Sequence, residues 1–225
     1  MKKFDDMVAR ARAAPRHIVL AEGQDQRVVE GAVRAWRDGI AEITLLGPVD
    51  DLRLLTRAAG DKNDEIQVID PQYAPEIEAY GKAFQDLRGQ NNEDLSKAHQ
   101  VMRDPLMFAN MMVHMGKASG SVSGAVHATA DVVRATLQVI GVDSRYSMVS
   151  SFFVLVMRED FHEFKGCMIF ADCALIVDPD EDQLVQIASA TADSAKTLFN
   201  FDPRVALLSF ATRRSADHHL VDKVE

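Results

Sequence analysis

The feature that most constrains the fold is a repeated order of strand pattern followed by helix pattern. Short apolar runs such as His17–Ala21 and Ile43–Gly47 each precede a stretch whose apolar residues recur at helical spacing. In the first such stretch, Asp25 can cap the helix start and Gly39 can close its end. The alternation predicts an α/β fold with a mostly parallel sheet.

The same criteria applied to the whole chain predict the following elements. We expect strands at 17–21, 43–47, 65–69, 121–125, 147–157, 167–171 and 205–210, and helices at 5–14, between 25 and 39, and at 49–59, 75–87, 93–101, 106–117, 130–140, 181–199 and 215–225. Four methionines between Met107 and Met115 are interpreted as core packing.

A domain boundary is predicted near Gly141–Ser144, because the later strands are longer and are separated by a charged segment, 158–165, of hairpin or surface-loop type. The chain is therefore divided into a first α/β domain, 1–143, and a second, 144–225. The amphipathic helix from Ser215 reaches Glu225 with no glycine or returning strand after it. Either this terminal helix is frayed or the second domain is incomplete.

Charge and cysteine content exclude several classes of protein. The net charge of −9 over 225 residues argues against nonspecific nucleic-acid binding, which needs an excess of Lys and Arg. No apolar run has the length of a signal peptide or membrane span, so a cytoplasmic protein without membrane attachment is expected. Cys167 and Cys173 lack metal-ligand spacing and are interpreted as reduced, buried thiols, with no metal site expected.

The segment from Gly120 to Arg134 is the most suggestive local motif. It is a strand that opens into a loop of small and hydroxyl residues and then a helix, so that backbone N–H groups can face an anion at the helix N-terminus. Ser123 and Thr129 can add hydroxyl donors, and Arg134 a two-pronged guanidinium. The segment is neither a Walker A loop nor a Rossmann motif. The alternative is a tight turn with a solvated arginine.

Four other polar residues have two interpretations each. Arg27, after the first strand, and Arg88, after a helix, are either anion ligands or surface charges. His127 is a general base by residue type, but no partner carboxylate is identifiable, which favours a satisfied polar residue. Asp172, after a buried strand, is a site residue or a turn cap.

Six blocks in the same order resemble the phosphate acetyltransferase family, over essentially the entire chain. They are Val19–Gly23 with Arg27, Leu87–Gly89, Val122–Ala125 with His127, Thr129 and Arg134, Ser151–Phe153, Phe170–Leu175, and Leu208–Phe210 followed by Thr212 and Ser215. One block would be weak, but six in order make an accidental resemblance improbable.

The resemblance implies two αβα domains of the isocitrate/isopropylmalate dehydrogenase-like type, with the second domain incomplete here, and a homodimer. It implies a role in acetate metabolism, with transfer of an acetyl group between coenzyme A and phosphate. Coenzyme A and acetyl phosphate are substrates, and no cofactor or metal is needed. By position, Arg88 and Arg134 would hold the phosphate or the coenzyme A anion, and Ser123, Thr129 and Ser151 would line the acyl-phosphate pocket, with Arg27 as a further candidate.

The chain departs from the family pattern in three places. Family members continue past Glu225 into a segment assigned to oxyanion stabilisation and thiol activation, so the catalytic residues are unassigned and we expect little transferase activity from this chain alone. Ser119 stands where the family has Asp, and Arg214 stands where it has Gly. Arg214 would either block coenzyme A or pair with its phosphates. Two alternatives are a non-catalytic domain binding acetyl-CoA or acyl phosphate, like that fused to malic enzymes, and a phosphate butyryltransferase.

Overall fold

The structure, a computed structural model, describes residues 2–89, 94–157, 166–200, 202–212 and 215–224. The chain divides into two compact units. We call Ala9–Gly141 the N-terminal unit, and Val142–Glu225 together with Met1–Val8 the C-terminal unit. No helix in the described ranges combines the length and the apolar character needed to cross a membrane.

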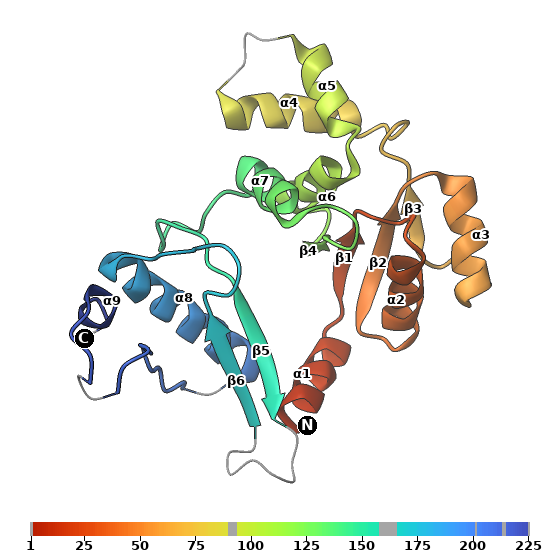
Figure 1. The fold of residues 1–225 in the computed structure, drawn as a ribbon. Coiled ribbons are helices and arrows are strands. Elements are labelled where there is room, and N and C mark those ends of the chain that lie inside the picture. The colour runs from red at the N-terminus through yellow and green to blue at the C-terminus, as the bar shows by residue number, and fades with distance from the viewer. Residues whose placement is uncertain (1, 90–93, 158–165, 201, 213–214, 225) are drawn as a thin grey trace. The chain divides into compact units, whose positions relative to one another are not determined.

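Figure 1 shows the order of the elements along the chain. They are α1 (Lys2–Ala13), β1 (Arg16–Leu20), α2 (Gln26–Arg37), β2 (Ala41–Leu46), α3 (Val49–Ala59), β3 (Gln67–Ile69), α4 (Ile77–Arg88), α5 (Leu95–Met102), α6 (Pro105–His114), β4 (Gly120–Val122), α7 (Thr129–Val139), β5 (Phe152–Met157), β6 (Gly166–Ala171), α8 (Glu181–Phe199) and α9 (His219–Asp222).

The N-terminal unit is built on a four-stranded sheet in the order β3-β2-β1-β4, with every pairing parallel. The central strand β1 aligns Leu20 with Leu45 of β2 on one side and with Val122 of β4 on the other. The predicted α/β fold with a parallel sheet is therefore confirmed. The carboxyl ends of β1 and β4 lie next to each other in this arrangement.

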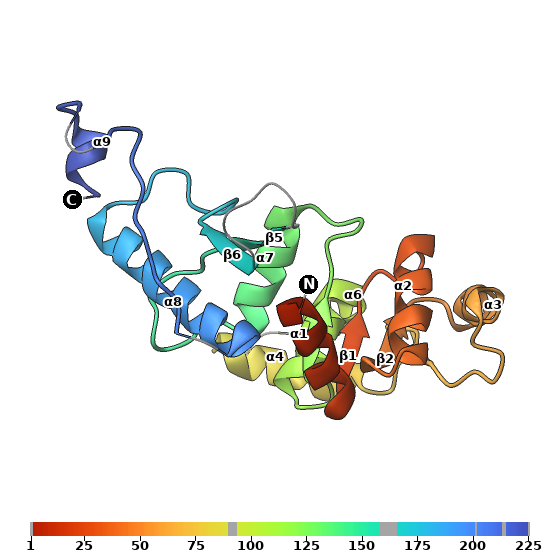
Figure 2. The same cartoon turned by 90° about the horizontal axis from the view of Figure 1, so that it is seen from below.

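Alternation along the strands explains the three layers of this unit. Val19 of β1 is buried in a cluster with α4 to α7, whereas its neighbours Ile18 and Leu20 pack on the cluster formed with α2 and α3. Successive strand side chains point to opposite faces, so one apolar strand supplies both cores. Figures 1 and 2 accordingly show α2 and α3 on one side of the sheet and α6 on the other.

Helix boundaries follow from capping residues. Asp25 accepts a hydrogen bond from the N–H of Arg27 at the start of α2, and Gly39 takes a positive φ just after its end. Asp104 caps α6, whose first residue is Pro105. Met107, Met111 and Met112 of α6 are buried, as the core interpretation predicted, while Met115 is partly exposed.

The C-terminal unit holds a different sheet. β5 and β6 pair antiparallel, and α8, which starts with a capping box between Asp180 and Gln183, contacts β6. The described pairing in this unit is therefore not parallel. The predicted hairpin or loop at 158–165 lies outside the described residues. Cys167 is buried and Cys173 is half-buried, and both thiols are free.

Three predicted elements of this unit are wrong in extent. Residues 147–151 precede β5 without strand pairing, because Ser147 and Ser151 bond to the side chains of Gln186 and Asp172. Val205–Phe210 forms no strand, because no described strand pairs with it, and its residues Val205–Leu207 line a cavity of about 570 Å³ with β6 and α8. The terminal helix covers only His219–Asp222.

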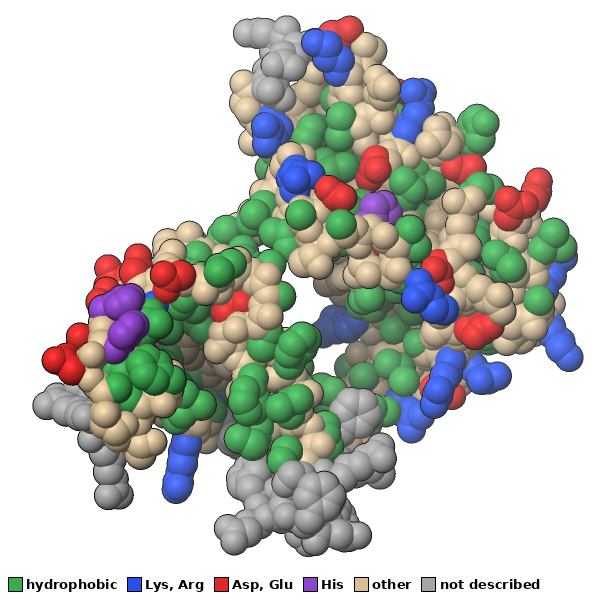
Figure 3. Space-filling view, in the orientation of Figure 1, with side chains coloured by type: hydrophobic (Ala, Val, Ile, Leu, Met, Phe, Trp, Pro, Cys, Tyr) green, Lys and Arg blue, Asp and Glu red, His purple; other side chains and the backbone are tan. Residues whose placement is uncertain are grey.

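Apolar side chains are unusually exposed in the C-terminal unit. The residues Phe152–Val156 of β5 are between 36% and 60% exposed, and Leu208 is 77% exposed. In Figure 3 the apolar side chains gather over β5. Contiguous exposed apolar surface of this kind is typical of a face that another segment covers.

Candidate functional site

The register of the sheet brings the end of β1 beside the loop after β4. Leu20 is paired with Val122, so two residues further along each chain Glu22 lies opposite Gly124. Glu22 is buried, with its side chain only 3% exposed. Gly124 has a φ of +104°, a backbone conformation that side-chain-bearing residues rarely adopt, and this turns the loop across the sheet edge.

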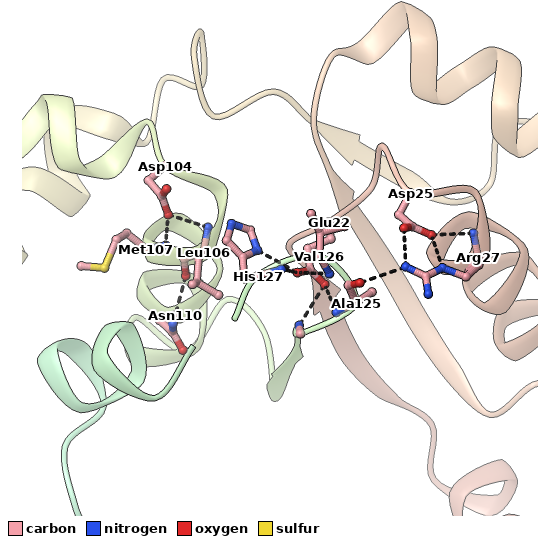
Figure 4. Close-up of polar contacts among 11 residues, drawn as sticks. Glu22, Asp25, Arg27, Asp104, Leu106, Met107, Asn110, Ala125, Val126 and His127 are labelled. Carbon is pink, nitrogen blue, oxygen red and sulfur yellow. Dashed lines mark hydrogen bonds and ion pairs between the residues drawn. The ribbon is translucent and has the colours of Figure 1, made fainter. Parts of the chain in front are cut away.

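The carboxylate of Glu22 accepts hydrogen bonds from four consecutive backbone N–H groups (Figure 4). The N–H groups of Gly124 and Ala125 donate to Oε2 at 2.9 and 2.7 Å. Those of Val126 and His127 donate to Oε1 at 2.9 and 2.7 Å. Successive N–H groups that converge on one anion form a nest, and in this chain the anion is supplied by the protein itself.

The same carboxylate fixes which ring nitrogen of His127 donates a hydrogen bond to it. Burial raises the pKa of Glu22, but the hydrogen bonds from the loop N–H groups and from the His127 ring outweigh this and lower it to about 2. Glu22 is therefore ionised at neutral pH and can only accept. Since His127 Nδ1 lies 2.7 Å from Oε1, this nitrogen carries a proton. Sequence reasoning missed this partner, because Glu22 and His127 are 105 residues apart.

Arg27 holds the other side of the loop. Its Nη2 donates to the carbonyl oxygen of Ala125 at 2.9 Å, and the guanidinium also bonds to both carboxylate oxygens of Asp25. Figure 4 shows Arg27 and Asp25 on the side of Ala125 away from His127. The loop is thus bonded through its N–H groups by Glu22 and through a carbonyl by Arg27.

The hydroxyl candidates and Arg134 flank this loop. Ser123 is half-buried just before the nest, and Thr129 is exposed as the first residue of α7. No side-chain hydrogen bond caps α7 at Ala128. Arg134, 63% exposed, reaches back along α7 and pairs with Asp131 at 2.8 Å. Thr129 is thus the first residue of α7, Ser123 lies before the nest, and Arg134 lies further along the helix.

One expectation for the loop is wrong as first stated. The N–H groups of Gly124 to His127 do face an anion, but that anion is the carboxylate of Glu22. These four N–H groups are therefore satisfied within the protein.

Arg88 and Ser151 are placed elsewhere in the fold. Arg88 is exposed at the last position of α4, and no hydrogen bond or ion pair among the described residues joins it to the loop. Ser151 belongs to the C-terminal unit, where its hydroxyl donates to Asp172 Oδ1 at 2.8 Å. That hydroxyl also accepts from the N–H groups of Cys173 and Ala174, so its hydrogen-bonding capacity is largely used within the turn.

Asp172 acts as a turn cap in the C-terminal unit. Its carboxylate accepts from the N–H groups of Ser151, Ala174 and Leu175. Burial raises the pKa of Asp172, yet these backbone donors reverse the effect and hold it well below its usual range. Of its two sequence-based interpretations, the contacts favour the turn cap.

The ionised state of Glu22 predicts a dependence of stability on pH. Its folded pKa, about 2, lies below its ordinary value of 4.5, so its contribution is complete above about pH 4.5 and is lost as the pH falls towards 2. The contribution amounts to at most about 3 kcal/mol. Urea unfolding at pH 6 and pH 3 should therefore show a larger difference between wild type and Glu22→Gln at pH 6. The exposed Glu30→Gln is the control, and an equal Glu22→Gln difference at both pH values would contradict the assignment.

The parallel sheet with a polar loop at its carboxyl edge defines an α/β protein of the class that binds ligands at this edge. The sequence profile of the phosphate acetyl/butaryl transferase family matches residues 3–225. The chain belongs to this family. It is 39% identical over 225 residues to a phosphate acetyltransferase from Thermoanaerobacterium thermosaccharolyticum. This match spans all of this chain and 68% of the relative. A second phosphate acetyltransferase, from Paracoccus denitrificans, is 38% identical over 224 residues, and this chain covers 67% of its length.

Solved structures agree with the sequence relatives. A phosphotransacetylase from Streptococcus pyogenes superposes with a TM-score of 0.88 at 36% identity, covering 99% of this chain and 66% of that one. The EutD phosphotransacetylase from Staphylococcus aureus superposes with a TM-score of 0.85 at 30% identity, covering 99% and 65%. The chain thus spans about two thirds of the length of these four relatives.

Proposed function

We propose that this chain is part of a phosphate acetyltransferase, which transfers an acetyl group reversibly between coenzyme A and phosphate. The family match and the relatives' names support this reaction. The structural observation that carries the proposal is the loop 123–129, which is held at the carboxyl edge of the sheet with the start of α7 free of a side-chain cap. Partial positive charge at such a helix start favours a phosphate group.

The residues of the loop suggest how acetyl phosphate is bound. We propose that Thr129 and Ser123 donate hydroxyl hydrogens to it and that Arg134 leaves Asp131 to pair with the phosphate oxygens. Arg88 and Arg27 remain candidates for the phosphate or for the coenzyme A anion, and Ser151 for the acyl-phosphate pocket. The two domains are proposed to be 1–143 and 144–225, in a cytoplasmic homodimer of acetate metabolism.

The reaction needs no covalent enzyme intermediate. The sulfur of coenzyme A forms a bond to the carbonyl carbon of acetyl phosphate, the carbon–oxygen bond to phosphate breaks, and phosphate leaves with the electron pair. The thiol proton passes to a base, for which no residue of this chain is assigned. Arginine and hydroxyl donors stabilise charge on the leaving phosphate. Coenzyme A acts as a substrate, and the proposal includes no further cofactor.

The test combines the formation of acetyl-CoA from acetyl phosphate and coenzyme A, followed by thioester absorbance, with calorimetric binding of acetyl phosphate, because little turnover is expected from these 225 residues alone. A phosphate butyryltransferase is the second candidate, because the matching family includes both activities in its description. Butyryl phosphate is therefore assayed in parallel. A preference for acetyl phosphate supports the proposal, and a preference for butyryl phosphate selects the second candidate. If calorimetry shows that the chain binds neither acyl phosphate, the proposed site is wrong.

We expect Arg134→Ala to weaken the binding of acetyl phosphate about tenfold or more, since a charged hydrogen bond contributes about 1.5–3 kcal/mol. The side chain is exposed, so the fold should persist. Isothermal titration calorimetry measures the change. Arg34→Ala, an exposed arginine on α2, is the matched control and should bind as the wild type does. Unchanged affinity in Arg134→Ala would remove this residue from the site.

A further inference from the structure

The buried carboxylate of Glu22 has no role in the transfer reaction described above, yet it makes more hydrogen bonds than any one loop residue. It joins two segments that are 102 to 105 residues apart in the sequence. Each of its two oxygens accepts from two backbone N–H groups, and Oε1 also accepts from His127 Nδ1. The contact therefore uses both oxygens fully.

We propose that Glu22 is a positioning residue of the loop 123–129, and that the four N–H groups form a carboxylate-binding nest which a free small carboxylate can occupy when the side chain is removed. The loop has no regular secondary structure between β4 and α7. Four N–H groups of this loop are bonded to the Glu22 carboxylate instead of to the backbone of a neighbouring strand. The flanking positions Ser123 and Thr129 depend on this backbone for their placement.

The nest is specific for a carboxylate on hydrogen-bonding grounds. A carboxylate offers acceptors at both oxygens, whereas an amide offers one oxygen and one NH₂ donor. In Glu22→Gln, one orientation turns the NH₂ group towards the N–H groups of Gly124 and Ala125. The other turns it towards those of Val126 and His127. Two backbone donors lose their acceptor in either case, although the side chain keeps its shape.

Glu22→Ala has a different effect, because it removes the side-chain carboxylate and keeps all four backbone N–H donors. The resulting cavity is polar and lined by four converging N–H groups, and a formate ion carries the same two oxygens as the lost side chain. Formate should therefore bind there and restore the loop. In Glu22→Gln the amide still fills the space, so formate should have no effect.

The test measures amide hydrogen exchange of Gly124 to His127 by NMR in the 225-residue chain. In Glu22→Ala we expect these four amides to exchange at least tenfold faster than in wild type, and sodium formate to restore protection saturably while sodium chloride at equal ionic strength does not. In Glu22→Gln two of the four amides should lose protection, without rescue. Glu30→Ala, on the exposed side of α2, should leave all four unchanged.

Unchanged protection in Glu22→Ala, or an absent formate effect, would overturn the proposal. If Glu22→Ala does not fold, Glu22→Gln alone tests the proposal. Protection of all four amides at the wild-type level in Glu22→Gln would refute the proposal. The effect on acetyl phosphate affinity, expected to fall in Glu22→Ala and to recover with formate, rests on the proposed function. Formate rescue of exchange without any acetyl phosphate binding would leave the role of Glu22 intact and reject only that function.

Discussion

Phe108→Ala is expected to lower the free energy of unfolding by about 3–5 kcal/mol, the largest effect of any single change considered for this chain. Phe108 of α6 is 0% exposed and lies at the centre of the core between α4 and α7. Its ring stacks at a tilt on Tyr80, with centroids 5.0 Å apart. Truncation removes buried apolar area and leaves a cavity that rigid neighbouring helices cannot fill.

Urea unfolding monitored by circular dichroism measures this loss. The matched control is Leu54→Ala on α3, where the side chain is 67% exposed and little buried area is lost. We expect the control to change stability by about 0.5 kcal/mol or less. A Phe108→Ala variant no less stable than Leu54→Ala would contradict the placement of Phe108 in the core.

Gly23→Ala is expected to destabilise the N-terminal unit by about 1–3 kcal/mol and to disturb the neighbouring Glu22. An added methyl group would lie 2.6 Å from the carbonyl oxygen of Leu46 and 2.9 Å from Cδ1 of Leu52. The Leu46 carbonyl cannot simply move away, because it accepts the N–H of Gly23 itself at 3.2 Å. The turn after β1 must therefore shift, and Glu22 with it.

Gly31→Ala provides the matched control for this prediction. Gly31 lies in the interior of α2, and apart from its chain neighbours and the local helix backbone no atom comes within 4 Å of the position an added methyl group would take. Alanine favours the helix over glycine by about 1 kcal/mol, so this variant should be as stable as wild type or more so. Thermal unfolding of both variants decides the matter. Equal stability of Gly23→Ala and Gly31→Ala would show that the turn tolerates a side chain.

Local signals explain why much of the N-terminal unit was predictable. The helix between Asp25 and Gly39 was read from a capping side chain, an apolar face and a closing glycine, all of which act within a few residues. The helix predicted at 49–59 has the same bounds in the structure. The strands β1 and β2 lie within two residues of their predicted bounds, because a buried parallel strand is a continuous apolar run wherever its neighbours lie. The predicted strands 65–69 and 121–125 are shorter in the structure, at Gln67–Ile69 and Gly120–Val122.

The C-terminal unit was harder because strand formation needs a partner. Val205–Phe210 has the composition of a strand, but no strand among the described residues pairs with it, and Leu208 stays exposed. Similarly, Ser147 to Ser151 form side-chain contacts with Gln186 and Asp172, which the local sequence does not reveal. Apolar content alone does not determine whether a segment pairs with another strand through backbone hydrogen bonds.

The sequence by itself determined the α/β class, the parallel sheet of the N-terminal unit and the position of the polar loop before α7, because periodicity, caps and glycines act locally. Only the tertiary structure decided what the loop binds. The pairing of β1 with β4 sets Glu22 against the N–H groups of Gly124 to His127, and gives His127 the carboxylate partner that sequence reasoning did not find. Contacts between residues a hundred positions apart depend on strand register, which no local pattern encodes.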